Sequence, residues 1–166
     1  MTLLESIEVP MGDPAKDFSL KATDGQRYSL ANFADAKLLV VIFMCNHCPY
    51  VQKIWHDWVA LQEEFEGDVQ FVGINPNTAN EEYDEETMEK MKEYYERYDM
   101  NFPYLEDPDQ AVASEYQAQC TPDIFVYGEG RKLVHHRSVT AEVLKALLEG
   151  RELEAENSMG CSIKWV

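Results

Sequence analysis

The segment KLLVVIFM, residues 37–44, constrains the fold more than any other part of the chain. After Lys37 it is continuously apolar and rich in β-branched residues, which is the pattern of a strand buried on both faces of a sheet. From Pro49 onward the apolar residues instead recur every three to four positions, at Val51, Ile54, Trp58, Leu61 and Phe65. That period predicts an amphipathic helix ending at Gly67. A buried strand that leads straight into a helix is typical of an α/β protein.

The remaining segments predict the other elements of a mixed sheet. DFSL (17–20) and RYSL (27–30) flank the turn pair Asp24-Gly25 and predict an N-terminal β-hairpin. VQFVGIN (69–75) predicts a second parallel strand, and Met88, Met91, Tyr95 and Tyr98 then mark one face of a helix. Farther on we expect an extended FPYLED (102–107), a short helix (110–119), a hairpin of DIFVYG (123–128) with KLVHHR (132–137), and a final helix (141–150). The predicted fold class is α/β, with a mixed central sheet flanked by helices on both faces and an N-terminal β-hairpin extension.

Length and charge limit the number of domains and the kind of partner. With 166 residues, 45% of them hydrophobic, the chain predicts one domain over 1–150. The tail over 151–166 ends in apolar residues, Ile163, Trp165 and Val166, which predict that it packs on the domain. The formal net charge of −17 disfavours nucleic acid and anionic membrane surfaces as partners, and favours basic or neutral ones.

The sequence also predicts a soluble, cytoplasmic protein. The N-terminal MTLLESIEVPMGDP has acidic residues and a proline where a signal peptide needs a basic start and a long apolar run. No later segment approaches the roughly 18 apolar residues of a membrane span. Because cytosolic thiols are kept reduced unless they are catalytic or sensory, the four cysteines do not suggest a permanent disulfide framework.

Two cysteines, Cys45 and Cys48, lie where the apolar strand gives way to the helix. A thiol at a helix N-terminus faces unsatisfied N–H groups and the positive end of the helix dipole, which stabilise the thiolate. His47, between them, is expected to donate to a thiolate, and Pro49 suits the first helical turn. We expect Cys45 to be the more exposed, attacking thiol and Cys48 the resolving one. The alternative is half of a zinc site, but its further ligands would have to come from Cys120, Cys161, His135 and His136, which are scattered singly.

A second motif, CTPDIFVY, begins at Cys120. Pro122 opens a strand that is expected inside the sheet, where its missing N–H is tolerated if the Thr121–Pro122 peptide is cis. The alternative is an ordinary trans proline in a loop before an edge strand.

Together the two motifs resemble the thioredoxin superfamily, and the chain from about Asp17 to Gly150 resembles its peroxiredoxin-like branch, the AhpC/TSA-type redoxins. VVIFMCNHCPYV stands at the C-x-x-C position of that fold, CTPDIFVY at its cis-proline position, and NFPYLEDPDQAVASEYQAQ between them. The resemblance implies that Cys45 is the nucleophile and Cys48 the resolving thiol. It also implies that Thr121 and Pro122 form the wall along which a substrate disulfide lies.

The chain departs from the proteins it resembles at positions that matter for chemistry. Peroxidases of the superfamily carry T-x-x-C, so Cys48 would be the peroxidatic residue, but Cys45 replaces the threonine. Their activating arginine is expected just before DIFVY, where Gln119, Cys120 and Thr121 stand. Thioredoxins carry a buried aspartate at the position of Leu39, so the general base is unassigned, with Glu106, Asp107 or a water as candidates.

These observations predict a thiol-disulfide oxidoreductase that uses a Cys45/Cys48 dithiol-disulfide couple, more oxidising than thioredoxin and without a cofactor. Its partners would be a disulfide-bearing protein or small-molecule disulfide and a cellular thiol reductant. Cys120 and Cys161 are candidate accessory thiols, Cys120 by approaching Cys45 across the site and Cys161 as a second resolving thiol. The alternatives are a thiol peroxidase that uses Cys48, and a non-catalytic metal-binding protein of the same fold.

Overall fold

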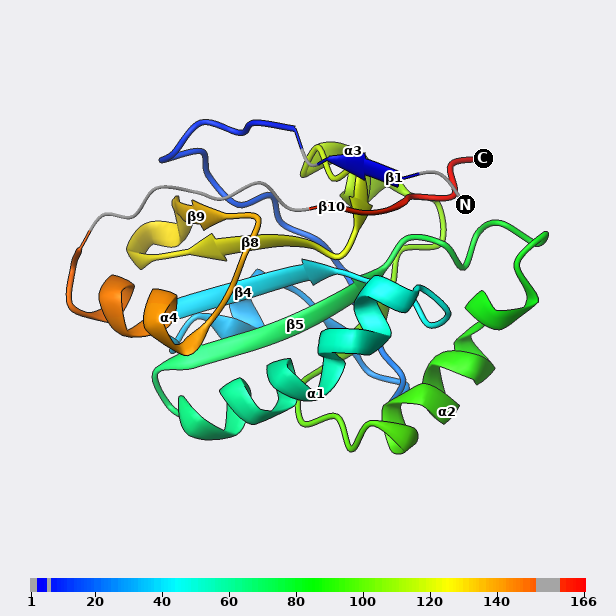
Figure 1. The fold of residues 1–166 in the computed structure, drawn as a ribbon, viewed down its shortest axis with the longest axis horizontal. Coiled ribbons are helices and arrows are strands. Elements are labelled where there is room, and N and C mark those ends of the chain that lie inside the picture. The colour runs from blue at the N-terminus through cyan, green and yellow to red at the C-terminus, as the bar shows by residue number, and fades with distance from the viewer. Residues whose placement is uncertain (1–2, 6, 152–158) are drawn as a thin grey trace.

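A computed structural model describes residues 3–5, 7–151 and 159–166 of the chain, with the backbone alone at 3–5 and 159–162. Its centre is a five-stranded mixed sheet (Figure 1). The strands lie in the order β6 (Tyr104–Glu106), β5 (Val69–Asn75), β4 (Leu38–Phe43), β8 (Asp123–Tyr127) and β9 (Leu133–His136). Central β4 is parallel to β5 and antiparallel to β8, and all six of its residues are buried. The predicted central strand, its parallel neighbour and the β8–β9 hairpin are thereby confirmed.

Helices cover both faces of this sheet, as predicted. Alternate residues of β4 enter two separate hydrophobic clusters, with Val40 and Ile42 on one face and Leu39 and Val41 on the other, because successive strand residues point to opposite faces. The first face packs against α1 (Pro49–Glu64), α2 (Met88–Arg97) and α4 (Ala141–Leu148). The second face packs against α3 (Ala111–Glu115) and the N-terminal hairpin of β2 (Leu20–Lys21) and β3 (Arg27–Tyr28).

A second, three-stranded antiparallel sheet joins the two ends of the chain and was not predicted. Its order is β1 (Leu3–Glu5), β10 (Met159–Ser162) and β7 (Cys120–Thr121). Figure 1 shows β1 and β10 side by side above the end of β8. In the ladder between β10 and β7, Cys161 pairs with Thr121 and Ser162 with Cys120. The C-terminal strand therefore lies directly against the segment that precedes Pro122.

Several elements differ in detail from the sequence prediction. Three short 3₁₀ helices, η1 (Leu30–Phe33), η2 (Asp84–Glu86) and η3 (Glu129–Arg131), occupy segments expected as strand end, loop and turn. In α1 the buried residues include Trp55 and Gln62, which the predicted apolar stripe lacked. Gln62 can be buried because it bonds to the backbone of β5: its amide donates to Val69 O and its oxygen accepts from Phe71 N. Among the described residues, no helix combines the length and the apolar character needed to cross a membrane.

Candidate functional site

The candidate site is the turn between β4 and α1, which carries Cys45, Asn46, His47 and Cys48. β4 stops at Phe43 and α1 begins at Pro49, so the turn lies at the carboxyl end of the central strand, where open α/β sheets form their sites. Cys48 is the N-cap residue of α1, and its carbonyl accepts from the amide N–H of Gln52 at 2.9 Å. Pro49 occupies the first helical turn, as predicted.

Both thiols of the turn converge on Thr121. The Cys45 sulfur lies 3.4 Å from the Thr121 hydroxyl oxygen, and the Cys48 sulfur donates to the Thr121 carbonyl oxygen at 3.4 Å. The Thr121–Pro122 peptide is cis, as predicted. The fold thus brings together the C-x-x-C turn and the Thr-Pro pair, which are far apart in the sequence.

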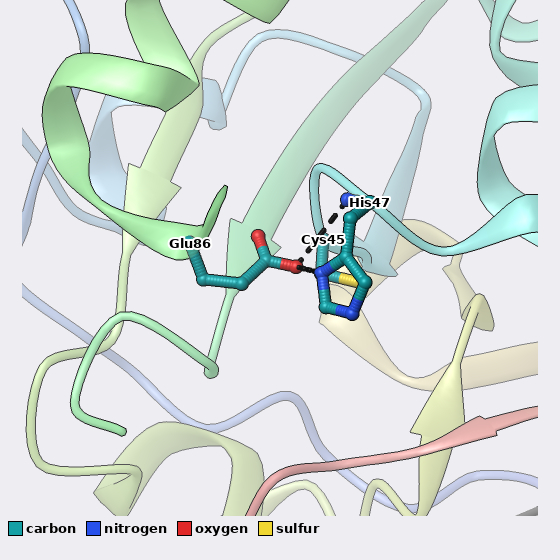
Figure 2. A group of neighbouring side chains, drawn as sticks. All are labelled: Cys45, His47 and Glu86. Atoms are coloured by element: carbon teal, nitrogen blue, oxygen red, sulfur yellow. Dashed lines mark hydrogen bonds and ion pairs between the residues drawn. The ribbon is translucent and has the colours of Figure 1, made fainter. Parts of the chain in front are cut away.

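A buried carboxylate, Glu86, holds the backbone of the turn. One of its oxygens accepts from Asn46 N at 2.7 Å and from the Asn75 amide at 3.1 Å; the other accepts from His47 N at 3.4 Å and pairs with His47 Nδ1. Figure 2 shows the carboxylate pointing at the imidazole ring, with the Cys45 sulfur beside it. Glu86 ends η2 and is 1% exposed, so donors from this turn and from Asn75 take the place of water around its carboxylate.

Asn46 anchors the turn from the other side. Its amide donates to Glu85 O at 2.7 Å and its oxygen accepts from the Tyr104 hydroxyl at 2.8 Å, while its carbonyl accepts from the Gln52 amide at 2.8 Å. The Asn46 side chain is fully buried, and its bond to Tyr104 is buried as well, whereas the bonds to Glu85 and Gln52 are partly buried. The loop that carries the thiols is therefore held rigidly against η2, β6 and α1.

The prediction that Cys45 is exposed and easily ionised is wrong for this structure. Cys45 is 1% exposed and Cys48 is fully buried. Burial raises the pKa of the Cys45 thiol well above its ordinary value, and the Cys48 hydrogen bond and the Glu86 charge raise it further, against a smaller lowering by Thr121. The sequence argument considered the helix terminus but not the cost of placing a thiolate beside a buried carboxylate. The expected oxidising potential loses its physical basis for the same reason.

His47 has a different partner from the one predicted. It pairs with Glu86 and not with a thiolate, and its ring stacks on Tyr83 with 5.7 Å between the ring centroids. The hydrogen bond to Glu86 raises the pKa of His47, and the nearby Cys48 raises it slightly as well. By reciprocity, a protonated His47 favours a Cys48 thiolate through charge alone. A role for His47 in stabilising a thiolate stays a proposal on this electrostatic basis.

The two accessory cysteines lie on neighbouring strands of the small sheet. The Cys120 sulfur donates to Pro122 O at 3.6 Å. Cys120 is fully buried, and its approach to Cys45 stays a prediction. Cys161 pairs with Thr121 through the backbone of β10, and its side chain lies outside the described residues.

The proposed substrate wall is covered by the chain itself. The resemblance implied that Thr121 pairs with an extended substrate, but in this structure β10 occupies that position. Of the two carboxylates suggested as a base, Asp107 accepts from Val112 N and Ala113 N and so caps α3, with burial raising its pKa to about 6. Glu106 ends β6, where it pairs with Asn75. Glu86 is the carboxylate at the thiols. Its position in a strongly acidic segment gave the sequence no signal that it is buried.

The ligand atoms of Cys45, His47 and Glu86 all lie within 4.8 Å of one another. A sulfur, an imidazole nitrogen and a carboxylate oxygen at such separations suit proton transfer and disulfide exchange, and they are also a donor set for a divalent metal ion. His135 and His136, the other candidate ligands, lie on β9; His136 pairs with Asp123 at 2.9 Å and His135 contacts Ser138 at 3.0 Å.

Comparison with known proteins identifies the family of the chain. Residues 11–136 match the model of the AhpC/TSA family. The chain is 24% identical over 125 residues to the thioredoxin-like protein YneN of Bacillus subtilis (strain 168), which covers 75% of this chain and 69% of that protein. An uncharacterized conserved protein from Geobacillus kaustophilus has a similar structure, with a TM-score of 0.93 and 37% identity over 100% of this chain and 97% of that one.

The fold also matches a more distant structure. The thioredoxin domain of a thiol-disulfide oxidoreductase from Bacteroides vulgatus aligns with a TM-score of 0.69 at 15% identity, over 86% of this chain and 99% of that one. At this identity the likeness shows the fold alone, and it confirms the predicted thioredoxin-like architecture. With the family model matching most of its length, the chain belongs to the AhpC/TSA family.

Proposed function

We propose that the protein is a thiol-disulfide oxidoreductase that uses Cys45 and Cys48 as its redox couple. The observation that carries this proposal is the convergence of the two sulfurs on Thr121, each at 3.4 Å from one of its oxygens. Two thiols of one turn that contact the same residue are suited to form and break one disulfide bond between them. The AhpC/TSA family and the thioredoxin-like fold support the same class of chemistry.

In the proposed reaction Cys45 attacks and Cys48 resolves. Cys45 is the thiol beside the partly exposed His47, whereas Cys48 lies against the Thr121 carbonyl. Glu86, within 4.8 Å of the Cys45 sulfur, replaces Glu106 and Asp107 as the proposed base that receives the Cys45 proton. The Cys45 thiolate then bonds to one substrate sulfur and expels the other as a thiolate. Cys48 attacks Cys45 and releases the second substrate thiol, so that two electrons pass to the substrate.

Access to the buried sulfurs requires movement at the small sheet. Since β10 pairs with Thr121, a disulfide-bearing protein would have to displace that strand, whereas a small disulfide could enter beside His47. We propose a disulfide-bearing protein or small-molecule disulfide as substrate, with a cellular thiol as the reductant that regenerates the dithiol form.

The decisive experiment equilibrates the protein across glutathione and dithiothreitol redox buffers and maps the bridged cysteines by peptide mass spectrometry. We expect a reversible Cys45–Cys48 bridge. Because burial disfavours the Cys45 thiolate, we expect its midpoint potential at or below the roughly −270 mV of thioredoxin. A bridge from Cys48 to Cys120 or Cys161, or oxidation of Cys48 to sulfinic acid while Cys45 stays reduced, would replace this proposal with the thiol peroxidase.

A further inference from the structure

A group of three potential metal ligands lies at the end of β4. Cys45 and Glu86 are almost completely buried, while the His47 side chain is 26% exposed and opens the group to solvent. The three residues come from two separate segments, the C-x-x-C turn and η2, and Figure 2 shows their side chains converging on one point. The group shares Cys45 with the redox couple and includes Glu86, the proposed base of disulfide exchange.

We propose that Cys45, His47 and Glu86 form a binding site for one Zn²⁺ ion in the reduced protein. The donors would be the Cys45 sulfur, His47 Nδ1 and one Glu86 oxygen, which are the three kinds of atom that zinc takes in proteins. A water entering beside His47 completes the fourth position, as in zinc sites with three protein ligands.

The spacing of the donors fits this ion after small side-chain rotations. Zinc bonds of about 2.0 to 2.3 Å in a tetrahedron place ligand atoms roughly 3.3 to 3.8 Å apart. The three atoms here lie within 4.8 Å of one another. The nitrogen and oxygen now share a hydrogen bond, so zinc would replace the proton between them and push them slightly apart, which the partly exposed imidazole permits.

The surrounding residues already orient two of the donors. The second Glu86 oxygen is held by Asn46 N and by the Asn75 amide, and the His47 ring is stacked on Tyr83. Hydrogen bonds and packing of this kind fix the direction of ligands around metal ions and raise affinity. Charge also balances, since a thiolate and a carboxylate together neutralise a divalent cation.

Cys48 does not belong to this group, although it completes the C-x-x-C motif. Its sulfur is turned toward the Thr121 carbonyl, to which it donates at 3.4 Å. The proposed site is therefore a one-thiolate site, unlike the half of a Cys₄ site that a C-x-x-C motif ordinarily indicates.

Binding of zinc would compete with redox chemistry at the same sulfur. A metal-bound Cys45 cannot attack a disulfide until the ion leaves, so zinc would inhibit disulfide exchange by the reduced protein. The proposal does not depend on the proposed function, because metal binding is measured directly. A protein that binds zinc through these residues but forms no Cys45–Cys48 bridge would retain this site and lose that function.

The test is a titration of the reduced protein with Co²⁺ under nitrogen, followed by displacement with Zn²⁺. We expect one equivalent of Co²⁺ to produce a thiolate-to-metal charge-transfer band, and Zn²⁺ to remove it. Cys45→Ser should abolish the band. His47→Ala and Glu86→Gln should each weaken binding by at least about tenfold, as loss of ligands or their supports does elsewhere.

Matched controls separate the site from adventitious binding. Cys48→Ser should keep the band, and the exposed neighbours His56→Ala and Glu85→Gln should leave the affinity unchanged. Since the His47 side chain is partly exposed, His47→Ala gives a result even if a buried variant fails to fold. Absence of the band, unchanged affinity in His47→Ala, or equal loss in Cys48→Ser would overturn the proposed ligand set.

Discussion

The buried Glu86 carboxylate lies against the C-x-x-C turn, and hydrogen-bond donors of Asn46, His47 and Asn75 surround it where water would otherwise do so. We predict that Glu86→Gln destabilises the protein by about 1.5–3 kcal/mol at pH 6, the usual range for hydrogen bonds to charged groups. Part of this loss should depend on pH. Glu86 raises the folded-state pKa of His47 above its unfolded value near 6.5, so the resulting stability is fully present below pH 6.5 or so and is lost as pH rises through the folded pKa.

Urea unfolding of wild type and Glu86→Gln at several pH values from about 6 to 8.5 checks this prediction. The difference between the two proteins should shrink with rising pH. Glu85→Gln, one residue earlier and exposed, is the matched control and should match wild type. A difference that stays constant over the whole range would show that His47 and Glu86 do not share a proton in the folded state.

The burial of Cys45 leads to a second prediction at the residue scale. In a reduced Cys48→Ser variant, we expect iodoacetamide to alkylate Cys45 at pH 7 at least about tenfold more slowly than a free cysteine, whose pKa is near 8.5. Both the low thiolate fraction and the 1% exposure act in this direction. The same protein in guanidinium chloride should react at the ordinary rate. Fast alkylation of the folded protein would instead restore the exposed nucleophile that the sequence predicted.

At the residue scale, the sequence identified the reactive residues but not their exposure or their ionisation. The identity of Cys45, Cys48, Thr121 and Pro122 came from local motifs, and the structure brings these four together. Ionisation and exposure depend on atoms from elsewhere in the chain. Glu86 comes from a distant 3₁₀ helix, and no local pattern distinguishes it from the exposed acids around it.

At the scale of elements, local periodicity predicted most of the central sheet and its helices, because each strand and helix carries its own apolar pattern. The small sheet escaped prediction because β1 and β7 are only three and two residues long and β10 is four. Strands this short have no readable period, and their pairing joins the ends of the chain. The covering of Thr121 by β10 is a consequence of that pairing.

We predict that removing residues 159–166 raises the rate of reaction with a peptide disulfide several-fold while lowering stability. The truncation frees the Thr121 backbone for substrate, and it removes the buried Ile163, worth about 1.5–3 kcal/mol. Kinetic assays with peptide and small-molecule disulfides, together with thermal unfolding, test both parts. Only the peptide reaction should accelerate strongly, because a small disulfide does not need the strand edge.

Two controls isolate the effect of the strand. Removal of Trp165 and Val166 alone, both exposed, should leave the rate unchanged because β10 remains. Full-length Cys161→Ser removes the fourth thiol without removing the strand. If Cys161→Ser reproduces the rate of the truncated protein, the cysteine and not the strand is responsible.

For the whole molecule, the net charge of −17 acts on every encounter with a substrate. Acidic residues are dense beside the site, where η2 and the segment before it contribute Glu81, Glu82, Asp84 and Glu85. We predict that a peptide disulfide flanked by lysines reacts at least about tenfold faster than the same disulfide flanked by glutamates at low ionic strength. The difference between the two rates should disappear near 1 M salt, because the Debye length there is only about 3 Å.

The position of the charge, and not only its sum, can be tested with matched variants. The double variant Glu81→Gln with Glu82→Gln should reduce the difference in reaction rate between the two peptides at low salt. These residues lie in the segment that leads into η2 and the site. The double variant Glu63→Gln with Glu64→Gln removes the same charge at the far end of α1, and it should reduce the rate difference less than the first variant does. Equal effects would mean that the field of the whole protein steers substrates. No effect of either pair or of salt would mean that the charge serves solubility and does not steer substrates.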